Sequence, residues 1–160
     1  MRNHFFIFAA QGFGTGRSPW APGTVGTLPG VGLYLVLAPL PLPAYIAIIL
    51  LLFYFGTFLC ELAAEQLGES DPPSVVWDEI VGVLVTLTAV PLTLINLILA
   101  FILFRIFDIW KPWPISWIQH RIHGGDGIML DDVVAGVMAG AMLNLLMFLM
   151  PAGIASMRFT

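Results

Sequence analysis

The stretch IVGVLVTLTAVPLTLINLILAFILFRIF, residues 80–107, decides how this chain folds. As one helix at ~1.5 Å per residue it would be ~42 Å long, which exceeds the ~30 Å hydrocarbon core of a bilayer. Pro91 lies near its middle, where it removes a helical hydrogen bond. The stretch is therefore either one long tilted helix kinked at Pro91 or two short helices that meet in a re-entrant hairpin.

The choice between these two structures decides which charged residues can act together. Asp78 and Glu79 precede the stretch, and Arg105, Asp108 and Lys111 stand at its end. A single crossing places the two groups on opposite faces of a bilayer. A hairpin brings both groups to the same face.

The composition is that of an integral membrane protein with one domain. The 160 residues are 59% hydrophobic and 10% charged, with a mean hydropathy of +0.94, whereas soluble domains are about a quarter charged. No separate block could bury a second core, so we expect a single domain over residues 1–160. The net charge of −4 and the lack of a Lys/Arg cluster exclude a nucleic-acid footprint.

Other apolar segments flank the central stretch. We expect helices from about 24 to 40 and from about 44 to 64, which form a hairpin around the turn Pro-Leu-Pro-Leu-Pro at 39–43. A last helix is expected from about Asp131 to Met150, opened by carboxylates that suit its positive end. The prediction is an all-α, multi-pass membrane protein with about four to five hydrophobic helices, including a kinked or re-entrant pair at 80–107.

The segment WKPWPISWIQHRIHGG, residues 110–125, has the composition of the lipid headgroup zone. Tryptophans with one polar edge favour this depth, and the cations can meet lipid phosphates there. With the hairpin, Arg17 and the cations of 105–121 share one face, which the positive-inside rule marks as cytoplasmic. His123 could shuttle a proton or simply hydrogen-bond to solvent or lipid.

Carboxylates near the ends of the apolar segments are candidate metal ligands. Hard oxygen ligands of this kind suit Mg²⁺, which usually completes its octahedron with water and substrate phosphate. A structural role is the alternative, since Asp131 could cap a helix and Glu79 could pair with an arginine. The candidates are Asp78, Glu79, Asp108, Asp131 and Asp132.

Cations and glycines supply candidate phosphate-binding groups. Arg105, Lys111 and Arg17 could bind phosphate oxygens, although Arg17 also fits a membrane anchor. The glycines of GFGTGRSPWAPGTVGT, residues 12–27, would let backbone amides approach an anion, assisted by hydroxyls such as that of Thr15. The spacing is not that of a P-loop, because no Gly-Lys-Ser/Thr follows.

At these residues the chain closely resembles the phosphatidylglycerophosphatase A family of bacterial membrane lipid phosphatases. The matching segments are GFGTGRSPWAPGTVGTLPG at 12–30, VWDEIVG at 76–82, FRIFDIWKPWPI at 104–115 and GGDGIMLDDVVAG at 124–136. They are spread over nearly the whole chain, and chance agreement of all four is implausible.

The resemblance implies an enzyme of phospholipid synthesis. The expected reaction is Mg²⁺-dependent hydrolysis of phosphatidylglycerophosphate to phosphatidylglycerol and inorganic phosphate, at the cytoplasmic face of the bacterial inner membrane. The only expected partners are the lipid substrate and the bilayer, with no obligate protein partner. Carried over position by position, the functional residues are Asp78, Glu79, Arg105, Asp108, Lys111, Asp131 and Asp132.

The resemblance also favours one topology and one metal site. A single site cannot draw on carboxylates separated by a bilayer, so the hairpin is expected, with Thr86, Thr88, Thr93 and Asn96 satisfying its turn. Asp126 is left out, because the family usually has an apolar residue there. The hypothesis is that Mg²⁺ is held by Asp78, Glu79, Asp131 and Asp132.

Another class of protein could use the same residues. Carboxylates at the membrane edge could form the ion path of a small cation transporter or channel subunit. A transporter needs charge near the bilayer midplane, however, whereas these charges stand at the ends of the apolar segments. A non-catalytic scaffold in a lipid-synthesis complex would tolerate neutral replacements of the acidic pairs.

Overall fold

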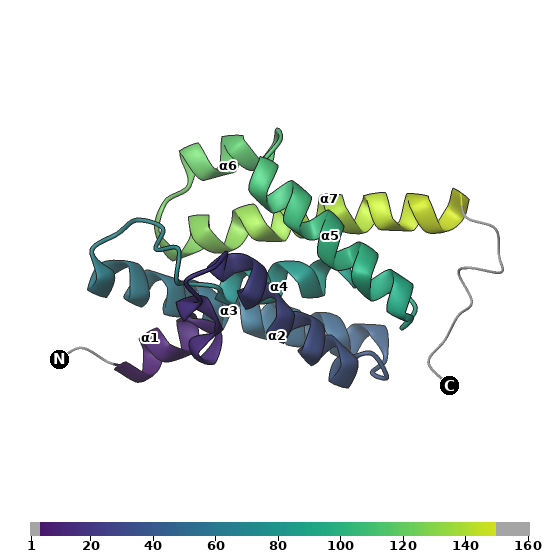
Figure 1. Ribbon diagram of the computed structural model, residues 1–160, viewed down its shortest axis with the longest axis horizontal. Coiled ribbons are helices and arrows are strands. Elements are labelled where there is room, and N and C mark those ends of the chain that lie inside the picture. Colours follow the sequence, from purple (N-terminus) through teal and green to yellow (C-terminus); the bar gives the residue numbers. More distant parts are fainter. Residues whose placement is uncertain (1–3, 150–160) are drawn as a thin grey trace.

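The computed structural model describes residues 4–149, whose regular elements are all helices and which contain no strand (Figure 1). This confirms the all-α prediction. In chain order the elements are α1 (His4–Ala10), the 3₁₀ segment η1 (Gly12–Arg17), α2 (Pro22–Leu37), α3 (Leu42–Leu67), α4 (Trp77–Thr86), α5 (Leu94–Trp110), α6 (Ile115–Arg121) and α7 (Gly124–Leu149).

Two of the described helices, α3 and α7, are long and apolar enough to cross a membrane. Each has 26 residues, with mean hydropathies of 2.3 and 1.9, and 26 residues at ~1.5 Å each make ~39 Å. Large apolar side chains are exposed along them, among them Leu51 on α3 and Phe148 on α7. Both helices are thus candidates for membrane contact, and the larger count of four to five hydrophobic helices stays a prediction.

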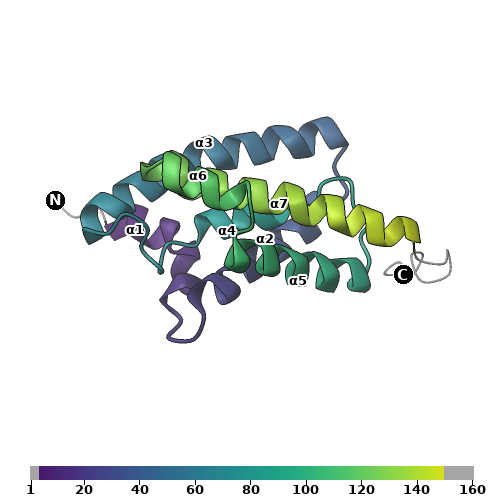
Figure 2. The ribbon, with the colours of Figure 1, turned by 90° about the horizontal axis from the view of Figure 1, so that it is seen from above.

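Helix α4 is the centre of the fold. It packs against α2, α3, α5 and α7 (Figure 2), and most of its residues are buried. Glycines permit this close packing: a Cβ at Gly82 of α4 would lie 2.5 Å from the Phe104 ring and 2.9 Å from the carbonyl oxygen of Asp132. The first turn of α4 is therefore held beside α5 and α7. Helices α2 and α3 are joined by a tight turn, as expected, but instead of packing mainly on each other as a hairpin, α2 packs mainly on α4, and α3 packs on α7 and α4.

The stretch 80–107 is divided between two helices, because α4 ends at Thr86 and α5 begins at Leu94. The segment between them is held by hydrogen bonds to its own neighbours. The Thr93 hydroxyl caps α5 by accepting from the Asn96 amide at 3.2 Å, and Asn96 Nδ2 donates to the Pro91 carbonyl at 2.9 Å. Thr88 donates to the Leu84 carbonyl. These three side chains act as the sequence predicted, whereas the fourth, the Thr86 hydroxyl, donates within α4.

Two tyrosines that the sequence analysis did not single out complete this turn. The Tyr34 hydroxyl of α2 donates to the Val90 carbonyl at 2.5 Å, and the Tyr45 hydroxyl of α3 donates to the Leu84 carbonyl at 2.7 Å. Both side chains are buried. Because an unpaired carbonyl in an apolar environment is costly, these two bonds anchor the α4–α5 connection to α2 and α3.

The last helix begins earlier than expected, at Gly124 instead of near Asp131. Its start is fixed by Glu61 of α3, whose carboxylate accepts a hydrogen bond from the Gly125 amide. Gly125 also lies directly against the backbone of Thr57, where a side chain would clash. Asp131 and Asp132 consequently lie inside α7, about two turns from its start. The expected end at Met150 lies outside the described residues.

Candidate functional site

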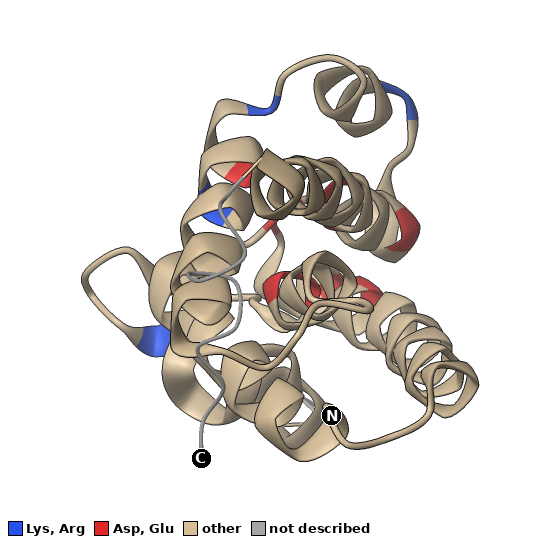
Figure 3. Cartoon of the chain, turned by 90° about the vertical axis from the view of Figure 1, so that its right-hand side faces the viewer, with Lys and Arg blue, Asp and Glu red and all other residues tan. Residues whose placement is uncertain are grey.

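The first turn of α4, the last turns of α5 and the third turn of α7 meet around one cavity of ≈ 260 Å³. We call it the acidic cavity. In Figure 3 the acidic segments lie mainly toward the middle of the molecule, with basic segments outside them. The charged lining of the acidic cavity consists of Asp71, Asp78, Glu79, Arg105, Asp108, Lys111, Asp131 and Asp132.

Three of these carboxylates form a compact group, here called the carboxylate trio. Asp78, Glu79 and Asp132 each offer one oxygen, and the three oxygens lie within 4.8 Å of one another. Within the described part of the chain, one buried oxygen of each has no hydrogen-bond partner: Asp78 Oδ1, Glu79 Oε2 and Asp132 Oδ2. Buried anions without partners are strongly disfavoured, so the trio fits a bound divalent cation with a preference for oxygen ligands.

Two cations stand beside the trio, and each is held by a carboxylate outside it. Arg105 Nη1 lies 2.5 Å from Asp108 Oδ2 and 3.7 Å from Glu79 Oε1. Lys111 Nζ lies 2.5 Å from Asp131 Oδ2. Lys111 adopts a left-handed backbone conformation, with φ 44°, at the end of α5. Both cations are thereby fixed at the wall of the acidic cavity, where they can meet an anion.

Burial and crowding determine the ionisation of the first acidic pair. Burial raises the pKa of Glu79 to about 8; the Asp132 and Asp108 charges act in the same direction, whereas a hydrogen bond with Asp78 and the Arg105 charge lower it. Burial, followed by the Glu79 charge, raises the pKa of Asp78 well above its ordinary range. The pair therefore tends to hold protons near neutral pH unless a cation replaces them.

The charge on Lys111 is secured despite its partial burial. Burial alone would lower the pKa of the ammonium group, but the Asp131 carboxylate outweighs this effect, with help from Asp132 and Asp108. The net result is a raised pKa. Lys111 is therefore a permanent positive charge at the cavity.

The N-terminal end of α2 forms another wall of the acidic cavity, at Pro22 and Gly23. A Cβ at Gly23 would lie 3.0 Å from Arg105 Nη2 and 3.1 Å from Nη1, and it would overlap Glu79 Oε1. The glycine is required here because the helix backbone approaches these two side chains so closely. Its amide is also one of the free donors at a helix start.

Comparison with known proteins identifies the family to which the chain belongs. The sequence pattern of the family described as phosphatidylglycerophosphatase A matches residues 8–147. The chain belongs to the phosphatidylglycerophosphatase A family. Phosphatidylglycerophosphatase A of Escherichia coli (strain K12) is 41% identical over 157 residues, covering 98% of this chain and 91% of that protein. The relative of the same name from Haemophilus influenzae is 42% identical over 132 residues, covering 81% of each chain.

A third relative is named for a different lipid headgroup. A Bacteroides thetaiotaomicron protein with the provisional name phosphatidylinositol-3-phosphatase is 41% identical over 138 residues, covering 82% of this chain and 86% of that protein. No solved structure matches the chain. The chain is thus a member of a phosphatase family.

All seven residues carried over from the family resemblance meet in the acidic cavity. These are Asp78, Glu79, Arg105, Asp108, Lys111, Asp131 and Asp132. Asp131 is not part of the trio, because Lys111 and the Asp132 amide engage its oxygens. Its role as a fourth metal ligand stays a prediction.

Two residues predicted to bind phosphate do not line the acidic cavity. The Thr15 hydroxyl donates to the Gly12 carbonyl at 2.9 Å. Arg17 donates to Gln11 Oε1 at 2.7 Å and lies over the Phe8 ring. These contacts assign both side chains to the packing of η1, and any phosphate contact by them stays a prediction.

Sequence reasoning did not single out Asp71, a charged member of the cavity wall, and it named Gly23 only as one of several glycines that could let backbone amides approach an anion. Asp71 comes from the loop between α3 and α4, and Gly23 from the start of α2. The signal for Asp71 was present in Asp-Pro-Pro at 71–73, an acidic residue held by prolines just before the WDE motif. Nothing local distinguished Gly23 from the other glycines of 12–30.

Proposed function

We propose that the protein hydrolyses the phosphomonoester of phosphatidylglycerophosphate to give phosphatidylglycerol and inorganic phosphate. The observation that carries the proposal is one cavity lined both by three carboxylates that each have an unpartnered buried oxygen among the described residues and by two cations held in ion pairs. Phosphoryl transfer needs this combination, since catalysis rests on positioning and on neutralising phosphoryl charge. Membership of the phosphatidylglycerophosphatase A family supports the substrate.

The trio of Asp78, Glu79 and Asp132 would hold the metal, which we propose to be Mg²⁺. When bound, Mg²⁺ polarises the phosphoryl group and compensates the negative charge of the cavity. The donor set is all oxygen and buried, which fits Mg²⁺ better than a softer metal. Asp131 lines the same cavity, with Oδ2 paired to Lys111 and Oδ1 accepting from the Asp132 amide, and we keep it as a candidate fourth ligand.

Arg105 and Lys111 bind the oxygens of the transferring phosphoryl group. The planar guanidinium of Arg105 can contact two oxygens at once, and its Nε is buried without a partner. Asp108 and Asp131 keep these cations in position through their ion pairs. Water attacks phosphorus opposite the glycerol oxygen, the phosphorus–oxygen bond to glycerol breaks, and the water proton passes to the alcohol product.

The helices suggest how the site meets the membrane. At ~1.5 Å per residue, α4 is ~15 Å long and cannot cross a ~30 Å core. Its first turn meets the end of α5, since Glu79 and Arg105 are ion-paired. We therefore propose a re-entrant α4–α5 pair enclosed by α2, α3 and α7, with the acidic cavity at one face of the bilayer.

That face is the cytoplasmic face of the bacterial inner membrane in our proposal. The cations Arg105, Lys111 and Arg121 gather at this end of the molecule, in accordance with the positive-inside rule. Trp110 and Trp113 nearby are 74% and 78% exposed. They suit the headgroup zone, where they would guide the diacylglycerol part of the substrate while only its headgroup enters the cavity.

The proposal is tested by phosphate release from phosphatidylglycerophosphate in detergent micelles, with Mg²⁺ and then with excess EDTA. Release should require Mg²⁺ and return when it is restored. Asp132→Asn should abolish release, because the trio loses a charged ligand, whereas Asp126→Asn on the same helix should not, since Asp126 is exposed and outside the acidic cavity. Metal-independent release, or a fully active Asp132→Asn enzyme, would refute the assigned chemistry.

A further inference from the structure

A second cavity adjoins the acidic cavity where α6 meets α7. This side cavity has a volume of ≈ 130 Å³, several times the ~30 Å³ that one water occupies in the liquid. Its polar lining is Ser70, Asp71, Gln119, His123 and Asp131. Asp71 and Asp131 also line the acidic cavity, so the two spaces share a wall.

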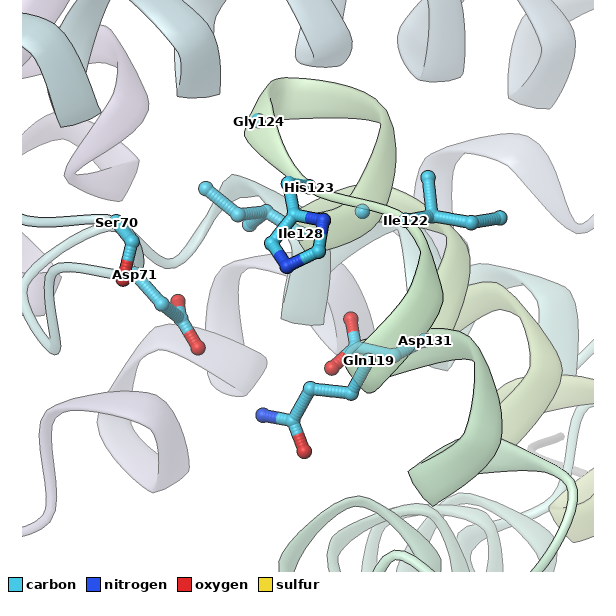
Figure 4. Close-up of a pocket in the computed structure, with 9 residues that line it drawn as sticks. Ser70, Asp71, Gln119, Ile122, His123, Gly124, Ile128 and Asp131 are labelled. Carbon is cyan, nitrogen blue, oxygen red and sulfur yellow. The ribbon is translucent and has the colours of Figure 1, made fainter.

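The side chains of the side cavity converge from different parts of the chain. Figure 4 shows Asp71 from the α3–α4 loop, His123 from the α6–α7 junction, and Gln119 and Asp131 around the same open space. Gln119 and His123 are themselves exposed, so the cavity opens to the surface. Because Asp71 and Asp131 border both cavities, a ligand group that lies along these two side chains would reach from the acidic cavity to the side cavity.

The chemistry of this lining suits a neutral alcohol better than an anion. Two carboxylates, an amide and a hydroxyl offer both acceptors and donors, and a ligand hydroxyl group, which donates and accepts, requires both. Among the described residues neither lysine nor arginine lines the side cavity, and the Asp71 carboxylate would repel a phosphate placed inside it. The cavity thus differs from the acidic cavity, where Arg105 and Lys111 supply positive charge.

We propose that the side cavity binds the hydroxyl-bearing alcohol to which the scissile phosphate is attached, and so determines which phospholipid headgroup is accepted. The proposal rests on the proposed function, because it places the phosphoryl group at the acidic cavity. The glycerol of the headgroup is the first group beyond that phosphate. Gln119 and Ser70 hydrogen-bond its hydroxyl and thereby select it.

Direct binding of two soluble probes tests this assignment without depending on turnover. Titration calorimetry on the purified Mg²⁺-loaded protein in detergent would compare sn-glycerol 3-phosphate, which carries the alcohol, with inorganic phosphate, which lacks it. We expect the wild type to bind glycerol phosphate about three- to tenfold more tightly, the gain of one or two hydrogen bonds. Phosphate release from the lipid is measured separately on the same preparation.

Variants test which residues cause the preference for glycerol phosphate over inorganic phosphate. Gln119→Leu and Ser70→Ala should weaken glycerol phosphate binding about three- to tenfold and leave inorganic phosphate binding unchanged. Ser116→Ala is the matched control, because Ser116 lies on α6 one turn from Gln119 and does not line the side cavity. Both substituted positions are exposed, so the fold should be retained.

The outcomes separate the two proposals. Equal affinity of the wild type for the probes, or parallel weakening of both probes in Gln119→Leu, would overturn the alcohol site. A preference for glycerol phosphate that Gln119→Leu removes, in a protein that releases no phosphate from the lipid, would support the alcohol site and refute the proposed reaction.

Discussion

Replacement of Gly23 by alanine tests the geometry of the acidic cavity with the smallest possible change. The added Cβ would stand 3.0 Å from Arg105 Nη2 and would overlap Glu79 Oε1. Ordinary contact begins near 3.4 Å, so the Glu79 carboxylate must retreat by about 1 Å and the guanidinium by a few tenths of an ångström. Glu79 would then leave the other two carboxylates of the trio.

The expected consequence is a large loss of activity without loss of folding. A displacement of about 1 Å in a catalytic group can cost about 100-fold in rate, and we expect kcat/KM to fall by at least that order. The Mg²⁺ concentration needed for half-maximal activity should also rise. Alanine is a better helix former than glycine, and Gly23 does not have a positive φ, so the thermal stability of the metal-free protein should not decrease.

The assay is phosphate release from phosphatidylglycerophosphate micelles over a range of Mg²⁺ concentrations, with thermal unfolding measured on the same samples. Gly32→Ala is the matched control, because a Cβ at Gly32 on the same helix meets nothing within 4 Å. That variant should keep wild-type kinetics. A Gly23→Ala enzyme with unchanged kcat/KM and unchanged Mg²⁺ dependence would show that Glu79 and Arg105 are not fixed as described, and would refute the reasoning.

Three further predictions concern the turn, the ionisation and the cations. Tyr34→Phe leaves the buried Val90 carbonyl without its donor, so it should lower the free energy of unfolding by about 1–3 kcal/mol, measured by thermal or denaturant unfolding. Tyr54→Phe, at an exposed position, should leave the free energy of unfolding unchanged. Glu79 has a folded pKa of about 8 against an ordinary 4.5, so the folded state binds more protons than the unfolded state between these pH values. The melting temperature of the metal-free protein should therefore fall as pH rises from 5 to 8, and the increase in melting temperature caused by Mg²⁺ should grow over the same range. A melting temperature that does not depend on pH would contradict the raised pKa. In Lys111→Asn, asparagine tolerates the left-handed backbone at this position but removes the positive charge, so kcat/KM should fall on the order of 100-fold at saturating Mg²⁺. A fall of less than threefold would exclude a phosphate contact by Lys111.

The sequence predicted the pieces of the site better than their arrangement. The acidic pairs and the cations of 104–115 were identifiable, because ionisable residues are rare in so apolar a chain and therefore conspicuous. The same reasoning predicted a phosphate contact for Arg17; the structure shows Arg17 in contact with Gln11 and Phe8, and the phosphate contact stays a prediction. A cation predicts an anion nearby, but it does not identify which one.

By itself, the sequence determined that the chain is all-α and apolar, that it is interrupted near Pro91, and that it carries the motifs of its family. These properties follow from local composition and spacing. Only the tertiary structure decided which carboxylates stand together: Asp132 joins Asp78 and Glu79, while its neighbour Asp131 faces Lys111. Adjacent residues on a helix point in directions about 100° apart, so their partners depend on how α7 is rotated against α4 and α5. That rotation is set by glycine contacts between helices far apart in the sequence, which no local pattern reveals.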